Sequence, residues 1–157
     1  MAGKIEAKLV ELGITLPVPM APIANYVPFV ITGDLVVISG QVPAVDGKIV
    51  TTGKVGPDGL SVEQGAAQAR QCFINLLTHL RVACGGDLDR VQQVIRLGGF
   101  IATTTNAFSQ HALVMNGASD LAVAVFGDAG RHARTTVGVP SLPADVPVEV
   151  EGMFRIA

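Results

Sequence analysis

The feature that most narrows the possible folds of this chain is a long stretch with helical periodicity in its middle. Over about residues 61–84, apolar side chains recur near one stripe of a helix. Ser61 and Gln64 form a capping-box pattern at its start, and Gly85-Gly86 follows its end. These signals predict one long helix bounded on both sides.

Strand-like segments surround this helix and a second one. The second helix is expected over about residues 110–126, and a short helix over 5–12 precedes a proline-rich connector. Strands are expected at 26–31, 35–39, 133–139 and 148–156, and in a stretch with an ambiguous start that ends at 101. This order predicts a single α+β domain over residues 1–157, with two helices on one face of a mixed sheet.

The composition indicates a packed core and a subunit interface. Hydrophobic residues make up 49% of the 157 residues, and the mean hydropathy is +0.48. No apolar run reaches the roughly 20 residues that cross a bilayer, and the N-terminus lacks the pattern of a signal peptide. We therefore expect a cytoplasmic homo-oligomer that covers apolar surface by assembly, without a membrane partner.

Charge and metal-ligand spacing exclude several classes of function. The formal net charge is −2 and no Lys/Arg cluster occurs, so no nucleic-acid partner is expected. Cys72 and Cys84 lie 84 − 72 = 12 residues apart in one predicted helix, too far for a disulfide. His79, His111 and His132 show no zinc spacing, so neither a metal nor a cofactor is expected.

The C-terminal region holds the charged side chains that are candidates for chemistry. Arg134 opens an otherwise uncharged strand, where its guanidinium is suited to bind a carboxylate. A surface arginine, or an ion pair at a subunit contact, is the alternative. Glu149 and Glu151 share one face of the last strand, either as a solvated face or with one of them near Arg134 and a water.

Four segments in the same order resemble the RidA/YjgF family, also called the endoribonuclease L-PSP family. The segment 134–151 has an arginine, a Leu-Pro turn and a Val-Glu-Val-Glu strand, and 37–43 contains a Ser-Gly-Gln element. Residues 68–80 resemble the family's first long helix, and 100–108 resemble a strand followed by an Asn-x-Phe step. Together these segments span nearly the whole chain.

The resemblance implies a fold, an assembly and an activity. The fold would be chorismate-mutase-like, and three subunits would pack their sheets into a central barrel with clefts between neighbours. The family's best known reaction is hydrolytic deamination of reactive enamines and imines, such as 2-aminoacrylate, to 2-oxo acids and ammonia. The expected partner is a small carboxylate metabolite.

By position, the resemblance also assigns roles to six residues of this chain. Arg134 would bind the substrate carboxylate, Glu149 would hold a water, and Tyr26 would be the N-terminal site tyrosine. The expected substrate-binding residues are Arg134, Ser39, Asn106 and Thr136. Thr136 stands where many members carry a cysteine.

The sequence departs from the family pattern in three places, as in a divergent subgroup. Residues 1–20 add a helix and connector, and 22–26 lack the usual Gly-Pro before the tyrosine. Residues 127–132 form an insertion before the arginine strand, in which Arg131 and His132 are either site residues or exposed loop residues. Besides deamination, the pattern leaves open a non-catalytic trimer that binds or senses a 2-oxo acid, a ribonuclease, and a purely structural trimer.

Overall fold

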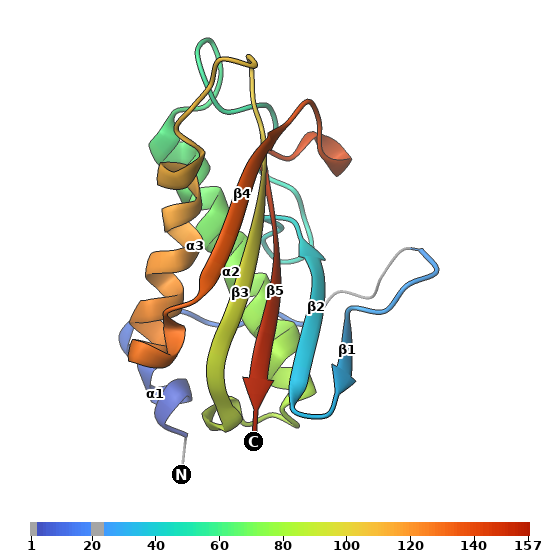
Figure 1. The fold of residues 1–157 in the computed structure, drawn as a ribbon, viewed down its shortest axis with the longest axis vertical. Helices are drawn as coiled ribbons and strands as arrows, with labels where there is room; N and C mark the ends of the chain where they lie inside the picture. Colours follow the sequence, from blue (N-terminus) through green and yellow to red (C-terminus); the bar gives the residue numbers. More distant parts are fainter. Residues whose placement is uncertain (1–2, 20–23) are drawn as a thin grey trace.

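A five-stranded mixed sheet forms one layer of the molecule, and helices cover one of its faces (Figure 1). The computed structural model describes residues 3–19 and 24–157. The strands are β1 (Phe29–Thr32), β2 (Leu35–Gln41), β3 (Val91–Ala102), β4 (Ala133–Val139) and β5 (Val148–Ile156). The α-helices are α1 (Lys4–Glu11), α2 (Val62–Ala83) and α3 (His111–Phe126). Three short 3₁₀ helices complete the described elements: η1 (Leu88–Arg90), η2 (Gly127–Gly130) and η3 (Pro143–Asp145).

The strand order, β1-β2-β5-β3-β4, explains why the sheet is mixed. The pair β3 and β4 is parallel, because α3 carries the chain back along the sheet between them. All other neighbouring strands pair antiparallel. The α+β class predicted from the sequence is confirmed, with α2 and α3 as the two long helices on the covered face.

The central strand β5 separates the two faces of the sheet. Val148, Val150 and Phe154 are completely buried on the helix side. Glu149 and Glu151 alternate with them and therefore lie on the opposite face, which no described helix covers. The shared face predicted for the two glutamates is confirmed.

The ends of several elements differ from the sequence-based expectation. The first strand begins at Phe29 rather than at residue 26, and β2 continues past Ser39 to Gln41. Asp46 and Gly47 form a turn, with φ angles of 48° and 77°, and a single bridge between Val45 and Lys48 flanks it.

The segment that contains α3 is more apolar than we expected from the sequence. His111–Gly130, which combines α3 and η2, is long and apolar enough to span a bilayer by length and composition alone. In the structure, however, Val114, Met115 and Ala118 are completely buried in the common hydrophobic core. The apolar character is that of a core helix in a folded domain.

A glycine lets the two long helices approach closely. A Cβ atom added to Gly117 of α3 would lie 1.8 Å from the backbone oxygen of Ala66 in α2. No side chain fits in that space, so the interhelical distance at this crossing depends on the absence of one.

We predict that Gly117→Ala destabilises the protein even though alanine favours helix by about 1 kcal/mol over glycine. The added methyl group must push α3 away from α2, and such overpacking costs about 1–3 kcal/mol. Urea unfolding measures the free energy of unfolding, and Asp120→Ala on the exposed side of α3 is the matched control. An increase in stability of Gly117→Ala would contradict the close approach.

Candidate functional site

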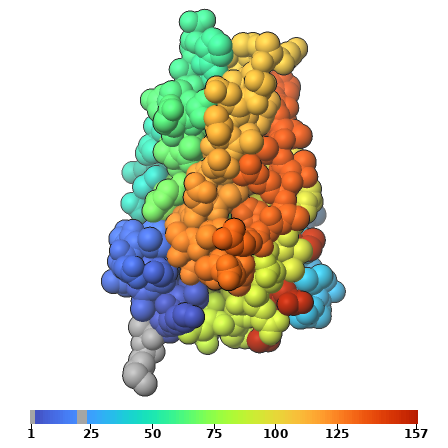
Figure 2. All heavy atoms as spheres, turned by 60° about the vertical axis from the view of Figure 1, so that its left-hand side comes forward, coloured from blue at the N-terminus to red at the C-terminus, as the bar shows by residue number. Residues whose placement is uncertain are grey.

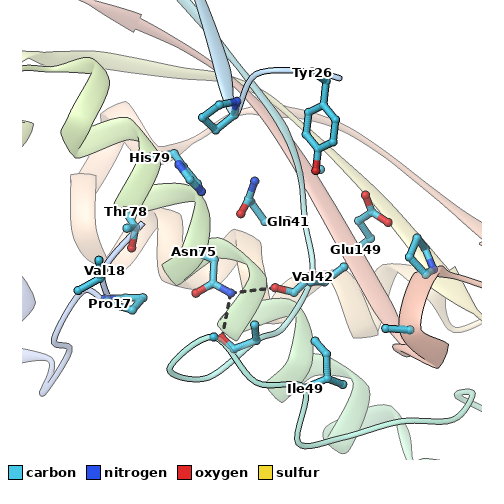
Figure 3. Close-up of a pocket in the computed structure, with 16 residues that line it drawn as sticks. Pro17, Val18, Tyr26, Gln41, Val42, Ile49, Asn75, Thr78, His79 and Glu149 are labelled. Atoms are coloured by element: carbon cyan, nitrogen blue, oxygen red, sulfur yellow. Dashed lines mark hydrogen bonds between the residues drawn. The ribbon is translucent and has the colours of Figure 1, made fainter. Parts of the chain in front are cut away.

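A cavity of about 360 Å³ opens between α2, the end of β2 and the N-terminal connector (Figure 3). Its polar side chains come from four regions of the chain, and its other walls are mostly proline, valine and alanine. The polar lining residues are Tyr26, Gln41, Asn75, Thr78, His79 and Glu149. The apolar side chains of the lining are Pro17, Val18, Pro28, Val42, Ala44, Ile49, Pro143 and Ala144. Its volume is at the lower end of the range of small-molecule sites, about 300–1,000 Å³.

Glu149 reaches this cavity because Gly40 has no side chain. A Cβ atom on Gly40 would lie 2.1 Å from Oε1 of Glu149. The register of β2 against β5 also shifts between Ile38 and Gln41, which opens the sheet at this point. Burial, followed by the nearby charge of Glu151, raises the pKa of the Glu149 carboxyl above its usual 4.5.

A ladder of polar residues on α2 forms another side of the cavity. Gln71, Asn75 and His79 follow one another at intervals of four, so they share a helix face. The amide of Asn75 donates to the carbonyls of Val42 at 2.8 Å and Ala44 at 3.0 Å, and accepts from Gln71 at 3.2 Å. Asn75 and Gln71 therefore hold the loop after β2, whereas His79 faces the cavity.

Arg134 lies in a separate cluster, at the opposite edge of the sheet between β4 and α3. Figure 2 shows this side of the molecule, with α3 and β4 next to each other in shades of orange. Its Nη1 donates to Asn116 Oδ1 at 2.8 Å and to Ser119 Oγ at 3.1 Å. Its Nη2 donates to the carbonyl of Ala112 at 3.3 Å. Three contacts with one helix fix the orientation of the guanidinium.

His132, in the segment predicted to be an insertion, orients Ser119, which in turn binds Arg134. Its Nδ1 lies 2.7 Å from the carbonyl oxygen of Gly130, which can only accept, so Nδ1 carries the proton. Its Nε2 then accepts from Ser119 Oγ, 2.9 Å away, and leaves a lone pair of that oxygen for Arg134. Burial, and secondarily the charge of Arg134, lower the pKa of His132 below 6.5, so the neutral ring that this network needs prevails at pH 7.

Arg134 and Glu149 are not neighbours within one chain. Leu97 of β3 pairs with Arg134, and Phe100 pairs with Glu149 across the other edge of the same strand. With strands about 4.8 Å apart and about 3.3 Å per residue, their Cα atoms are roughly 14 Å apart. Their side chains also point to opposite faces, because Leu97 and Arg134 lie on the helix side.

The remaining predicted site residues are scattered. Ser39 donates to the carbonyl of Val27 at 2.8 Å, at the edge of the cavity rather than in its lining. Asn106 lies exposed in the turn after β3, and Arg131 is an exposed partner of Asp128. Thr136 is on the same side of β4 as Arg134, and its Oγ1 is buried without a hydrogen-bond partner among the described residues. Residues 22–23 of the N-terminal departure lie outside the described residues.

Sequence reasoning missed His79, Asn116 and Ser119. A signal for His79 was available in the sequence. Gln71, Asn75 and His79 recur at intervals of four on a mostly apolar helix. No local pattern marks Asn116 and Ser119, because only the crossover of α3 brings them to Arg134.

Within residues 3–19 and 24–157, no group of three or more His, Cys, Asp or Glu side chains is arranged to hold a metal ion. Cys72 and Cys84 are buried free thiols, and burial raises the pKa of both. None of the described residues that line the cavity is a lysine or an arginine. The cavity therefore offers hydrogen-bonding groups and one carboxyl, and Arg134 offers the cation at the other edge.

Comparisons with known proteins agree on one family. The sequence profile described as "YjgF/chorismate mutase-like, putative endoribonuclease" matches residues 6–151. Protein TCP17 of Trypanosoma cruzi is 41% identical over 156 residues, which cover 99% of this chain and 96% of that protein. The structure of Atu1372 from Agrobacterium tumefaciens, a protein of unknown function, aligns with a TM-score of 0.88 and 44% identity, covering 98% of this chain and 92% of the other.

A more distant structure shows how far the fold extends. Escherichia coli TdcF with bound serine aligns with a TM-score of 0.60 and 25% identity, over 91% of this chain and 96% of that one. The lower score agrees with a divergent branch rather than a different fold. With its fold and nearly its whole length matched, the chain belongs to the YjgF family of chorismate-mutase-like proteins, the RidA/YjgF family.

Proposed function

We propose that the protein hydrolyses imines and enamines of 2-oxo acids at sites that two neighbouring subunits complete. The observation that carries this proposal is the separation of the two candidate clusters. Arg134 lies at the β4 edge, and the cavity with Glu149 and Tyr26 lies toward the β1–β2 edge. Both contribute to one site only when the β4 edge of one chain faces the cavity of another.

Such a contact joins two different surfaces, so it is heterologous and closes into a ring when the rotation permits. A homotrimer is the ring that we propose. The bare sheet face supports it, because apolar side chains on that face stay in solvent in a single chain. Val30, Val37 and Val137 are 53%, 40% and 42% exposed there, and assembly would cover them.

The contacts of Arg134 leave suitable donors for a substrate carboxylate. Both Nη1 hydrogens and one Nη2 hydrogen are engaged by α3. Nε–H donates to no described residue, and Nη2 keeps a second hydrogen, so the guanidinium retains two donors for the two oxygens of a carboxylate. The fork is therefore held in advance for bidentate binding, which lowers the entropy cost of orienting the substrate.

Glu149 of the neighbouring subunit is the proposed proton carrier. An imine carbon is electrophilic once its nitrogen is protonated, so neither a metal nor a covalent nucleophile is needed. Glu149 accepts a proton from water while the water oxygen bonds to the imine carbon, giving a carbinolamine. Glu149 then passes this proton to the nitrogen, and its carboxylate takes the hydroxyl proton as the C–N bond breaks and the carbonyl forms, so that ammonia and a 2-oxo acid leave. The proton on Glu149 finally passes to ammonia or solvent. The raised pKa of Glu149 suits both steps.

The electrostatics of the cavity argue against RNA as the ligand. Glu149 faces the cavity and none of the described residues that line it is basic, so a phosphodiester backbone would be repelled. The net charge of −2 gives no general attraction for a polyanion. The serine bound to TdcF is an amino acid with a carboxylate, which is the ligand chemistry proposed here.

We predict that the wild type accelerates ammonia release from 2-aminoacrylate generated in situ, and that Arg134→Ala lowers kcat/KM by about 100-fold or more. The loss follows from two charged hydrogen bonds of about 1.5–3 kcal/mol each. Arg155→Ala, which removes an exposed arginine of β5, is the matched control and keeps its activity. Absence of any acceleration by the wild type would contradict the enzymatic proposal.

Mixing two inactive variants tests whether the halves come from different chains. When Arg134→Ala and Glu149→Gln subunits are unfolded and refolded together, roughly one quarter of the interfaces pair the two intact halves. Activity should then return to about that fraction of the wild-type value. A mixture as inactive as its components would place both residues in one chain's site.

The activity should fall on the acid side as Glu149 becomes protonated. Since burial and Glu151 raise this pKa, the fall occurs as pH drops through a value above 4.5. Glu151→Gln removes the repelling charge and should shift the acid limb of kcat/KM to lower pH. Glu149→Gln should abolish the limb and lower kcat by about 10²–10⁴-fold. An unchanged limb in both variants would assign it to another group.

Ser119→Ala should weaken substrate binding through Arg134. One hydrogen bond of about 0.5–1.5 kcal/mol is lost, so KM should rise about 2- to 10-fold with little change in kcat. Ser119→Thr keeps the hydroxyl and should restore KM.

Because protonated His132 offers Ser119 no acceptor, wild-type affinity for 2-oxobutyrate should also fall as pH drops through a pKa below 6.5. Ser119→Ala should lack that dependence, and if it retained it the network would not act through Ser119.

A further inference from the structure

We infer that His79 is a specificity-determining residue, which selects substrates whose side chain ends in an uncharged hydrogen-bonding group such as a hydroxyl. The inference rests on the proposed function and adds a substrate class to it. It concerns a residue of α2 that none of the sequence-based assignments included.

The position of His79 is set by the ladder on α2. The amide groups of two of its three members form hydrogen bonds within the chain. Asn75 donates both amide hydrogens to the loop after β2, and Gln71 donates to Ala44 and Asn75. One turn further on, His79 passes beyond the reach of that loop and lines the cavity (Figure 3). The same face of α2 therefore binds the loop after β2 at Asn75 and lines the cavity at His79.

His79 is nearly enclosed, yet its ring has no hydrogen-bond partner among the described residues. Only 4% of its surface is exposed. Its neighbour Thr78 donates its hydroxyl back to the carbonyl of Ile74 at 3.1 Å, so it is not held by the histidine. The ring nitrogens of His79 are not among the fully buried side-chain atoms without a partner in the described chain, so they open onto the cavity, where a ligand can supply hydrogen-bond partners.

The charge state of His79 restricts what that partner is. Burial alone lowers the pKa of the ring below 6.5, with no neighbouring acid to offset it, so the imidazole is neutral at pH 7. A neutral imidazole has one N–H donor and one acceptor nitrogen. A hydroxyl likewise donates and accepts, whereas a methyl group would leave both ring nitrogens unsatisfied.

The other walls of the cavity exclude charged side chains. Glu149 repels an anionic group, and nothing in the lining compensates a second negative charge. The prolines, Val18 and Ile49 enclose the aliphatic part of a ligand. A substrate with its carboxylate toward Arg134 of the neighbouring subunit would extend an aliphatic stem along these walls to His79.

The test compares pairs of 2-oxo acids of nearly equal shape. Hydroxypyruvate is matched with 2-oxobutyrate, and 4-hydroxy-2-oxobutyrate with 2-oxopentanoate, so that each pair exchanges only a terminal hydroxyl for a methyl. Isothermal titration calorimetry gives Kd for each compound with the wild type, His79→Leu, His79→Gln and the apolar lining control Ile49→Val. Circular dichroism and the melting temperature establish that each variant is folded.

We expect the wild type to bind the hydroxylated member of at least one pair about 10-fold or more tightly than its methyl partner. His79→Leu should remove or reverse that preference while still binding the methyl compound, and His79→Gln should retain part of it. Ile49→Val should leave the ratio unchanged. If His79→Leu does not fold, the ratio in His79→Gln decides, since an amide also donates and accepts.

Two results would overturn the inference in distinguishable ways. If the wild type binds 2-oxo acids through Arg134 but His79→Leu keeps the wild-type ratio, the inference fails and the proposed function stands. If no 2-oxo acid binds the wild type at all, the proposed function fails and the inference falls with it.

Discussion

The arrangement of the molecule depends on the burial of alternate side chains of β5. This strand is third of five in the sheet and pairs with β2 on one side and β3 on the other. Val148, Val150 and Phe154 can leave water only against the helices, which fixes which face they occupy. The pleat then forces Glu149 and Glu151 onto the opposite face, where the charge of Glu151 adds to burial in raising the pKa of Glu149. A one-residue slip would bury both acids in the apolar core.

The same sheet order separates the two candidate clusters. The crossover through α3 makes β4 an edge strand and lays α3 beside it, so Arg134 finds its partners on that helix and not on β5. Glu149 meets the cavity at the other side, where Gly40 leaves room for its carboxyl. Neither cluster resembles a complete site by itself. Among the described residues, Arg134 has no counter-charge and Glu149 has no cation, and the proposed function joins the two through a contact between chains.

Two of the three histidines are enclosed by the protein rather than fully exposed on its surface. His79 and His132 are both partly or fully enclosed, and burial lowers the pKa of each. Their neutral rings differ in what they contact. His132 has both nitrogens engaged, by Gly130 and Ser119, and so fixes Arg134 indirectly. His79 makes no hydrogen bond to the described residues, which leaves its two ring nitrogens for the ligand proposed above.

The sequence alone determined the elements and the family. The capping box at Ser61 and the periodicity behind it defined α2, and the alternation after residue 147 defined β5, because both signals are local and strong. Ordered motifs then indicated the RidA/YjgF family, with Arg134, Glu149 and Tyr26 as candidate residues. The tertiary structure alone decided which candidates lie together. Asn116 and Ser119 are 18 and 15 residues from Arg134 in the chain, and only the path of α3 beside β4 brings them into contact. The amide of Asn75 forms hydrogen bonds with the loop after β2, whereas His79 faces the cavity. This difference depends on where the loop ends, which no local sequence pattern specifies.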